Sequence, residues 1–149
     1  MELHEEMAAM ILGNGLCAMA TCGGGAPRAS LMSYAVEPDC SSIYLATGSG
    51  TRKWANLREN PRVSLLIDER CQAPDGDRSR VRALTLDCLH IPLEVPAAKR
   101  AALERIAARH PHLRDFLSGA DMEPVRLKPL KCLLLRGASG SSFIDLEEK

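Results

Sequence analysis

Apolar and polar residues alternate along most of this chain, and only a few segments show helical spacing. Alternation predicts six strands, over residues 16–21, 28–36, 42–47, 63–67, 81–93 and 131–136, with a last extended piece over 142–146. Apolar spacing of three and four residues predicts helices over 3–12 and 96–109. Many strands joined by short turns favour a mainly β (α+β) fold in which an antiparallel sheet closes into a barrel.

The segment from Ile43 to Asp68 reads as strand, glycine-containing turn, short helix, turn and second strand. A loop rich in hydroxyl groups, residues 47–51, leads to Arg52 and Lys53 in the first turn of that helix. Free backbone N–H groups and the positive end of the helix dipole meet there, so two added cations are not what the helix itself favours. We therefore expect an anion site, most simply for a phosphomonoester. The alternative is a solvated helix start with two surface charges.

Length and charge limit the remaining possibilities. The 149 residues suit one domain over 1–149, with one core. Lys plus Arg and Asp plus Glu are both 19, and a formal net charge of zero gives no general attraction to nucleic acid or to anionic membrane. No apolar run is long enough to span a bilayer, and the first residues do not resemble a signal peptide, so we expect a cytoplasmic location.

Six cysteines raise the question of a disulfide or metal site: Cys17, Cys22, Cys40, Cys71, Cys88 and Cys132. None forms a C-x-x-C pair. Cys88 and His90 would share one face of a strand, but no second pair of ligands accompanies them. We predict that the cysteines are buried small side chains and that the chain has no metal site.

The order of short motifs in the central segment resembles one known superfamily. These motifs are Ala46-Thr47, Thr51-Arg52-Lys53, Asn56-Leu57 and Asn60-Pro61-Arg62-Val63. Together they resemble the pyridoxamine 5'-phosphate oxidase-like, FMN-binding split-barrel superfamily. The resemblance implies a six-stranded antiparallel split β-barrel with flanking short helices, and FMN bound between the two subunits of a homodimer.

The resemblance also implies which residues hold the flavin. The FMN phosphate would lie at the loop–helix corner, with a further contact from Arg28 across the hairpin, and the strand from Arg28 to Ser33 would line the isoalloxazine ring. The cofactor-binding residues expected on this basis are Arg28, Ala29, Ser30, Leu31, Ala46, Thr47, Thr51, Arg52 and Lys53. For Arg28 the alternative is an exposed arginine at a strand end. No catalytic residue is predicted.

The last third of the chain resembles the heme-utilisation branch of these split barrels. A helix ending in Arg109-His110-Pro111 precedes a short helix over 113–117, and a segment over 125–130 returns to the final strand. Pyridoxamine phosphate oxidases carry a C-terminal Arg-x-His segment, and a lysine at the position that matches Ser33. Neither occurs here, so we do not expect synthesis of pyridoxal phosphate.

Two function classes follow from these observations. One is an FMN-dependent oxidoreductase that passes electrons between a small-molecule donor and an acceptor; the other is an FMN-binding carrier, sensor or electron-transfer protein without turnover. A third is a heme-binding split barrel. An apolar strand from Val63 to Ile67, with Leu66 on its second face, agrees with burial at a homodimer interface.

Overall fold

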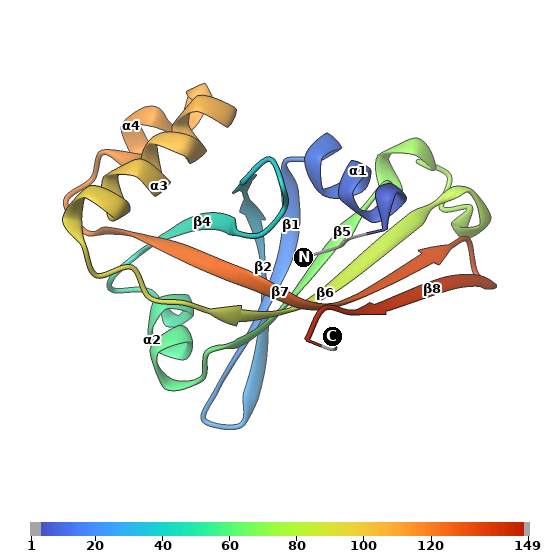
Figure 1. Ribbon diagram of the computed structural model, residues 1–149, viewed down its shortest axis with the longest axis horizontal. Coiled ribbons are helices and arrows are strands. Elements are labelled where there is room, and N and C mark those ends of the chain that lie inside the picture. Colours follow the sequence, from blue (N-terminus) through green and yellow to red (C-terminus); the bar gives the residue numbers. More distant parts are fainter. Residues whose placement is uncertain (1–3, 148–149) are drawn as a thin grey trace.

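The computed structural model describes residues 4–147, and antiparallel strands form the larger part of its regular secondary structure (Figure 1). The strands are β1 (Leu16–Gly23), β2 (Ala26–Ser33), β3 (Ala35–Val36), β4 (Ile43–Gly48), β5 (Arg62–Asp68), β6 (Arg82–His90), β7 (Met122–Arg136) and β8 (Gly140–Asp145). They form one sheet, curled into a half-barrel, in the order β2-β1-β5-β6-β7-β4-β3, and β8 pairs with β7. The predicted fold class, a mainly β split barrel with short flanking helices, is confirmed.

Strand β7 joins the two halves of the sheet. Its first part pairs with β4 and its last part with β8, while β6 runs along it over most of its length. The register places Met122 opposite Gly48, where β4 ends. As a result, the turn that precedes β7 lies beside the loop that leads out of β4, and Ser49 N–H donates to the carbonyl oxygen of Asp121 at 2.8 Å.

Alternate residues of the central strands fill the inside of the half-barrel. In β6 the buried face is the one that carries Leu84, Leu86 and Cys88, while its neighbours on the other face are more exposed. Helix α1 (Glu5–Gly13) covers one part of this core with Met7, Met10 and Ile11, all at most 2% exposed. Burial of side chains of this size contributes about 1.5–3 kcal/mol each.

The other helices begin and end where the sequence dictates. Helix α2 (Arg52–Glu59) follows its N-cap residue, Thr51. Helix α3 (Pro96–Arg109) has the predicted bounds, because proline suits its first position and His110-Pro111 ends it. A 3-10 turn, η3 (Pro111–Leu113), then leads to α4 (Arg114–Leu117). Helices α3 and α4 lie on the side of the sheet formed by β4 and the start of β7 (Figure 1).

Two strand predictions differ from the structure. The strand expected over 28–36 is divided into β2 and β3 at Tyr34, whose N–H donates to Gly15 O and whose fully buried hydroxyl donates to Ile11 O at 2.6 Å. These two hydrogen bonds hold the backbone at Tyr34 away from the path of one continuous strand. The last predicted strand begins nine residues earlier than expected, at Met122, and the extended piece pairs with it as β8, which makes eight strands.

Two further details concern the segment after β5 and the strand β5 itself. The polar segment 69–80 contains two 3-10 turns, η1 (Arg70–Gln72) and η2 (Arg78–Arg80). In η2 the Asp77 side chain accepts from Ser79 N–H at 3.1 Å and fixes the turn. Leu66 is only partly buried in the single chain, while Leu65 and Ile67 beside it are fully buried.

Candidate functional site

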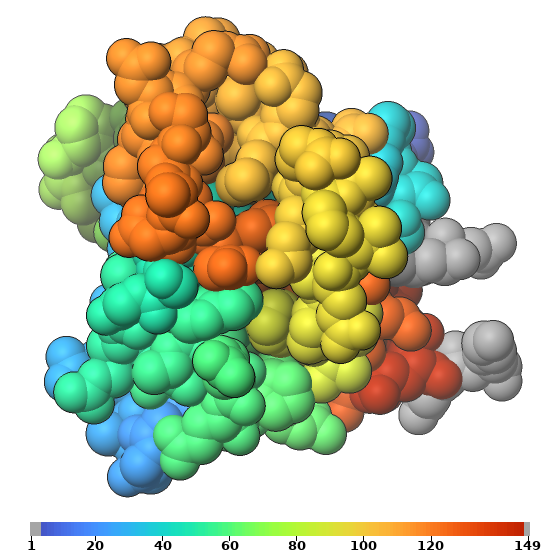
Figure 2. Space-filling view, turned by 90° about the vertical axis from the view of Figure 1, so that its left-hand side faces the viewer, coloured from blue at the N-terminus to red at the C-terminus, as the bar shows by residue number. Residues whose placement is uncertain are grey.

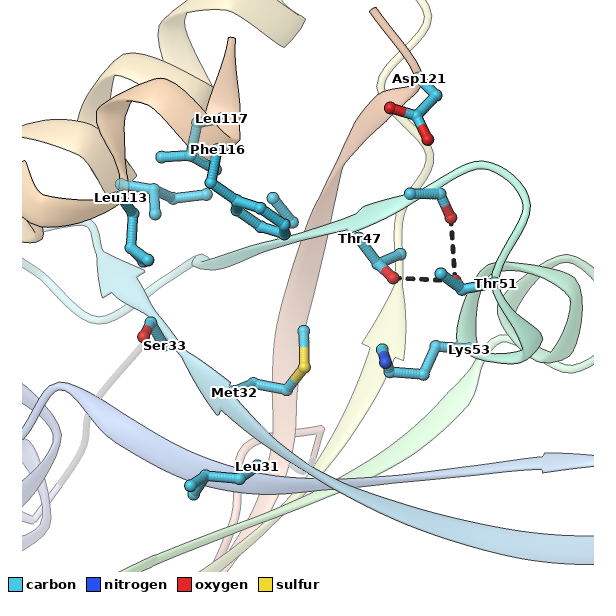
Figure 3. A pocket seen from close by; sticks show the side chains of 13 residues that line it. Leu31, Met32, Ser33, Thr47, Thr51, Lys53, Leu113, Phe116, Leu117 and Asp121 are labelled. Atoms are coloured by element: carbon cyan, nitrogen blue, oxygen red, sulfur yellow. Dashed lines mark hydrogen bonds between the residues drawn. The ribbon is translucent and has the colours of Figure 1, made fainter. Parts of the chain in front are cut away.

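The corner between β4 and α2 is built around two threonine hydroxyls (Figure 3). Thr51 Oγ1 accepts from Trp54 N–H at 3.2 Å and donates to Gly48 O at 2.8 Å. Because that donation uses the only proton of the Thr51 hydroxyl, the 2.8 Å contact between the hydroxyls has Thr47 as its donor. Within residues 4–147 the backbone N–H groups of Arg52 and Lys53 make no hydrogen bond, so both can donate to an anion.

A cavity of about 430 Å³ opens beside this corner and has one polar end and one apolar wall. Lys53 extends from α2 into it, near Thr47 (Figure 3). The apolar wall is formed by two groups of side chains, one from β2 and one from η3 and α4: Leu31, Met32, Leu113, Phe116 and Leu117. Ser33, Ala46, Gly48, Thr51, Ile106 and Asp121 complete the lining. The volume lies within the usual range for small-molecule sites, about 300–1,000 Å³.

Asp121 introduces a negative charge at the polar end (Figure 3). Its Oδ2 would lie 3.2 Å from a Cβ added to Gly48, so glycine at this position allows the carboxylate to stand close to the loop. Lys53 and Asp121 are the two ionisable side chains that line the cavity. An anion bound here is therefore attracted by one ammonium group and repelled by one carboxylate, and the backbone N–H groups decide the balance.

The structure brings five of the nine predicted site residues into one cavity: Leu31, Ala46, Thr47, Thr51 and Lys53. Arg28, Ala29, Ser30 and Arg52 do not line it. Arg28 is exposed and lies opposite Thr21 in the β1–β2 pair, and Arg52 is exposed on α2. In the single chain Arg28 therefore lies where the alternative interpretation expected it, as an exposed arginine on a strand.

The remaining lining residues could hardly be predicted from the sequence. Leu113, Phe116 and Leu117 lie about seventy residues from Thr47 in the chain, and only the folding of η3 and α4 over β4 brings them there. Phe116 is 59% exposed, which is unusual for a large aromatic side chain. The one signal in the sequence that could have indicated this wall is the group of apolar residues over 113–117, in a helix too short to form a core of its own.

Helix α2 is held against the β1–β2 hairpin by polar contacts. Asn56, 3% exposed, donates from Nδ2 to Thr21 Oγ1 at 3.1 Å, and both carboxylate oxygens of Glu59 accept from Gly24 N–H at 3.2 Å. A Cβ on Gly23 would stand only 2.0 Å from Asn56 Oδ1, so only glycine allows this approach. These contacts fix the direction in which Lys53 leaves the helix.

Most of the cysteines are buried. All six are free thiols; four are buried as predicted (Cys17, Cys40, Cys88 and Cys132), whereas Cys22 is partly exposed and Cys71 exposed. Burial raises the pKa of Cys17 to about 12, so that this thiol stays protonated at neutral pH. Across residues 4–147, no three His, Cys, Asp or Glu side chains are grouped to hold a metal ion. In the same part of the chain no helix has the length and apolar character that crossing a membrane requires.

Sequence comparison assigns the family. Residues 3–119 match the sequence profile of the family described as Pyridoxamine 5'-phosphate oxidase. The chain belongs to this family. A pyridoxamine 5'-phosphate oxidase homolog of Schizosaccharomyces pombe is 35% identical over 79 residues, and the match covers 44% of this chain and 40% of the yeast protein. The chain thus matches well under two thirds of that relative.

Solved structures show how this member of the pyridoxamine 5'-phosphate oxidase family relates to others of the same fold. A heme binding protein from Mycobacterium smegmatis superposes with a TM-score of 0.80 at 17% identity, over 99% of this chain and 60% of that protein. An FAD-binding protein from Mesorhizobium loti gives a TM-score of 0.68 at 20% identity, over 87% and 89% of the two chains. Identities this low show a shared fold, and the two proteins differ in what they bind.

Proposed function

We propose that this chain binds FMN in the cavity beside Lys53 and acts as an FMN-dependent oxidoreductase on a small-molecule donor or acceptor. The observation that carries the proposal is the union of a polar corner and a flat apolar wall in one cavity. The phosphate would be held by Lys53 and by the N–H groups of Arg52 and Lys53, and the ring would lie along Leu31 and Met32. FMN, when bound, supplies the redox chemistry.

The side chains of the apolar wall would orient the flavin and exclude water. Leu113, Phe116 and Leu117 approach the cavity from η3 and α4, opposite the β2 side chains (Figure 3). A dry site strengthens the hydrogen bonds and charge interactions made at its polar end. No catalytic residue is assigned, because Lys53 and Asp121 lie at the end of the cavity that would receive the phosphate.

We also propose that the active form is a homodimer. Leu31, on the edge strand β2, is 75% exposed, and Leu16, on the neighbouring strand β1, is 55% exposed. Together with Leu66 they line an apolar cavity of about 560 Å³. A second copy of the chain would cover these leucines and, because Leu31 also lines the first cavity, would complete the flavin site.

The composition of the cavity favours FMN over heme. Among its lining residues only Met32 is of a type that ligates heme iron; no histidine, cysteine or tyrosine lines it. His110 is committed elsewhere, since its Nε2 lies 2.7 Å from Tyr34 O. A heme bound in this cavity would find only Met32 among the lining residues as a ligand for its iron.

Oxidation of pyridoxamine phosphate needs a second phosphate site, and the two cations nearest the end of β7, Arg136 and Lys131, both face carboxylates. Arg136 is bound to Glu6 at 2.7 Å and to Ser142 Oγ at 2.9 Å. Lys131 lies opposite Asp145 in the β7–β8 pair. We therefore expect the FMN-loaded protein to form no pyridoxal phosphate from pyridoxamine phosphate in air, and sustained turnover would restore the oxidase assignment.

Spectroscopy of the flavin tests the proposed function. FMN is added to the purified protein, unbound flavin is removed, and NADH or NADPH is added with and without oxygen. Retention of FMN followed by bleaching of its absorbance supports an oxidoreductase. Retention without bleaching by any donor favours the carrier, sensor or electron-transfer alternative. Failure to retain FMN, combined with saturable binding of heme, would contradict the proposal.

A further inference from the structure

A second cavity, of about 420 Å³, lies between α2 and the segment that leads from β6 into α3. Figure 2 shows this face, with α2 in green and the start of α3 in yellow. The cavity shares no lining residue with the proposed flavin site. Leu57 and His90, 2% and 5% exposed, form its floor, and Leu93 is among the side chains around them.

His90, one of the residues that line this cavity, carries an unsatisfied polar atom. Its Nε2 is buried and has no hydrogen-bond partner within residues 4–147. Burial lowers the pKa of His90, as does the nearby charge of Arg126, and both favour the neutral imidazole. In the tautomer that carries the proton on Nδ1, Nε2 is an acceptor without a donor. Buried acceptors of this kind are rare, because leaving them unpaired is costly.

An aromatic surface and two cations surround this acceptor. The Trp54 ring meets His90 edge-on, with 6.1 Å between ring centroids and 69° between ring planes. Arg58 is exposed and Lys99 is partly buried, and both line the cavity. Lys99 is bound by Glu123 at 3.4 Å, a long contact that leaves its charge only partly compensated. The cavity thus combines a buried acceptor, a flat ring and a cationic rim.

We propose that this cavity binds a small aromatic acid that carries a hydroxyl or N–H donor. The donor pairs with His90 Nε2, the aromatic ring packs against Trp54 and Leu93, and the carboxylate lies between Arg58 and Lys99. Because Nε2 is buried, the side chains around it must shift for the donor to reach it. The site does not depend on FMN, since none of its residues lines the other cavity.

Trp54 is the only tryptophan of the chain, so its fluorescence reports this cavity directly. The probe is 4-hydroxybenzoate, titrated into flavin-free protein, with benzoate as the matched ligand that lacks the donor. We expect saturable change of Trp54 emission by 4-hydroxybenzoate and a Kd about tenfold lower than that of benzoate, the effect of one buried hydrogen bond. Arg58→Gln should weaken both ligands alike.

Variants of His90 test the buried acceptor. His90→Phe should bind both ligands with the same weak affinity, whereas the control His112→Phe, at an exposed histidine outside the cavity, should behave as wild type. A preference for 4-hydroxybenzoate that survives in His90→Phe would overturn the proposal, as would no saturable response in wild type. If His90→Phe does not fold, Arg58→Gln decides, and unchanged affinity for 4-hydroxybenzoate in that variant overturns the proposal.

Discussion

Lys53→Ala should weaken FMN binding, while Arg52→Ala, one residue earlier on the same helical turn, should not. Lys53 lines the cavity and Arg52 is exposed outside it. Two unit charges 4 Å apart interact by about 4 kcal/mol at an effective dielectric constant of about 20. Lys53 is partly exposed, so we expect a net loss of about 2 kcal/mol, typical of a charge-assisted hydrogen bond and equal to about thirtyfold in Kd.

Each variant is titrated with FMN, and the quenching of flavin fluorescence reports binding. The dissociation constants of the two variants then give the difference in FMN affinity. Arg52→Ala is the matched control and should lose less than about 1 kcal/mol, the usual limit for an exposed charge pair. Riboflavin, which has no phosphate, should bind Lys53→Ala and wild type equally well. If Arg52→Ala lost as much FMN affinity as Lys53→Ala, the view that Lys53 and not Arg52 contacts the phosphate would be refuted.

Three further changes test other parts of the account. Leu31→Glu should give a monomer by light scattering, because it places a charge in the exposed apolar surface proposed to pair; a dimer of wild-type stability would contradict this. Asp121→Asn should tighten FMN binding by less than tenfold, because an exposed carboxylate near the phosphate is removed. Arg136 and Arg82 hold the pKa of Glu6 below its ordinary value, so Glu6 stabilises the fold above that value and loses this effect as pH falls. Glu6→Gln should thus melt below wild type at pH 7, and the two should converge in acid.

Local signals in the sequence predicted much of the fold because each is a short-range effect. Pro96 and the His110-Pro111 pair act on the backbone next to them, and α3 has the bounds that they imply. The alternation along residues 81–93 predicted a strand there, and β6 lies within that range. The division at Tyr34 escaped prediction, because it depends on bonds to Gly15 and Ile11, about twenty residues away.

The candidate site was predicted only in part for a similar reason. The helix start with Thr51 and Lys53 is local, and the cavity includes both. Arg28 is four residues before Met32 on β2, which is about 13 Å along a strand. Of these two residues, Met32 lines the cavity and Arg28 does not. Asp121 comes to the corner through the pairing of β4 with β7, a long-range register that alternation alone does not specify.

The affinity of the wild-type protein for FMN compared with riboflavin tests the central claim most directly. The two ligands share the isoalloxazine ring and differ in the phosphate, so their difference isolates the polar corner at Thr51 and Lys53. We predict that FMN binds at least about a hundredfold more tightly, the effect of two charge-assisted hydrogen bonds of about 1.5–3 kcal/mol each. Equal affinity for the two ligands would contradict a phosphate site at this corner.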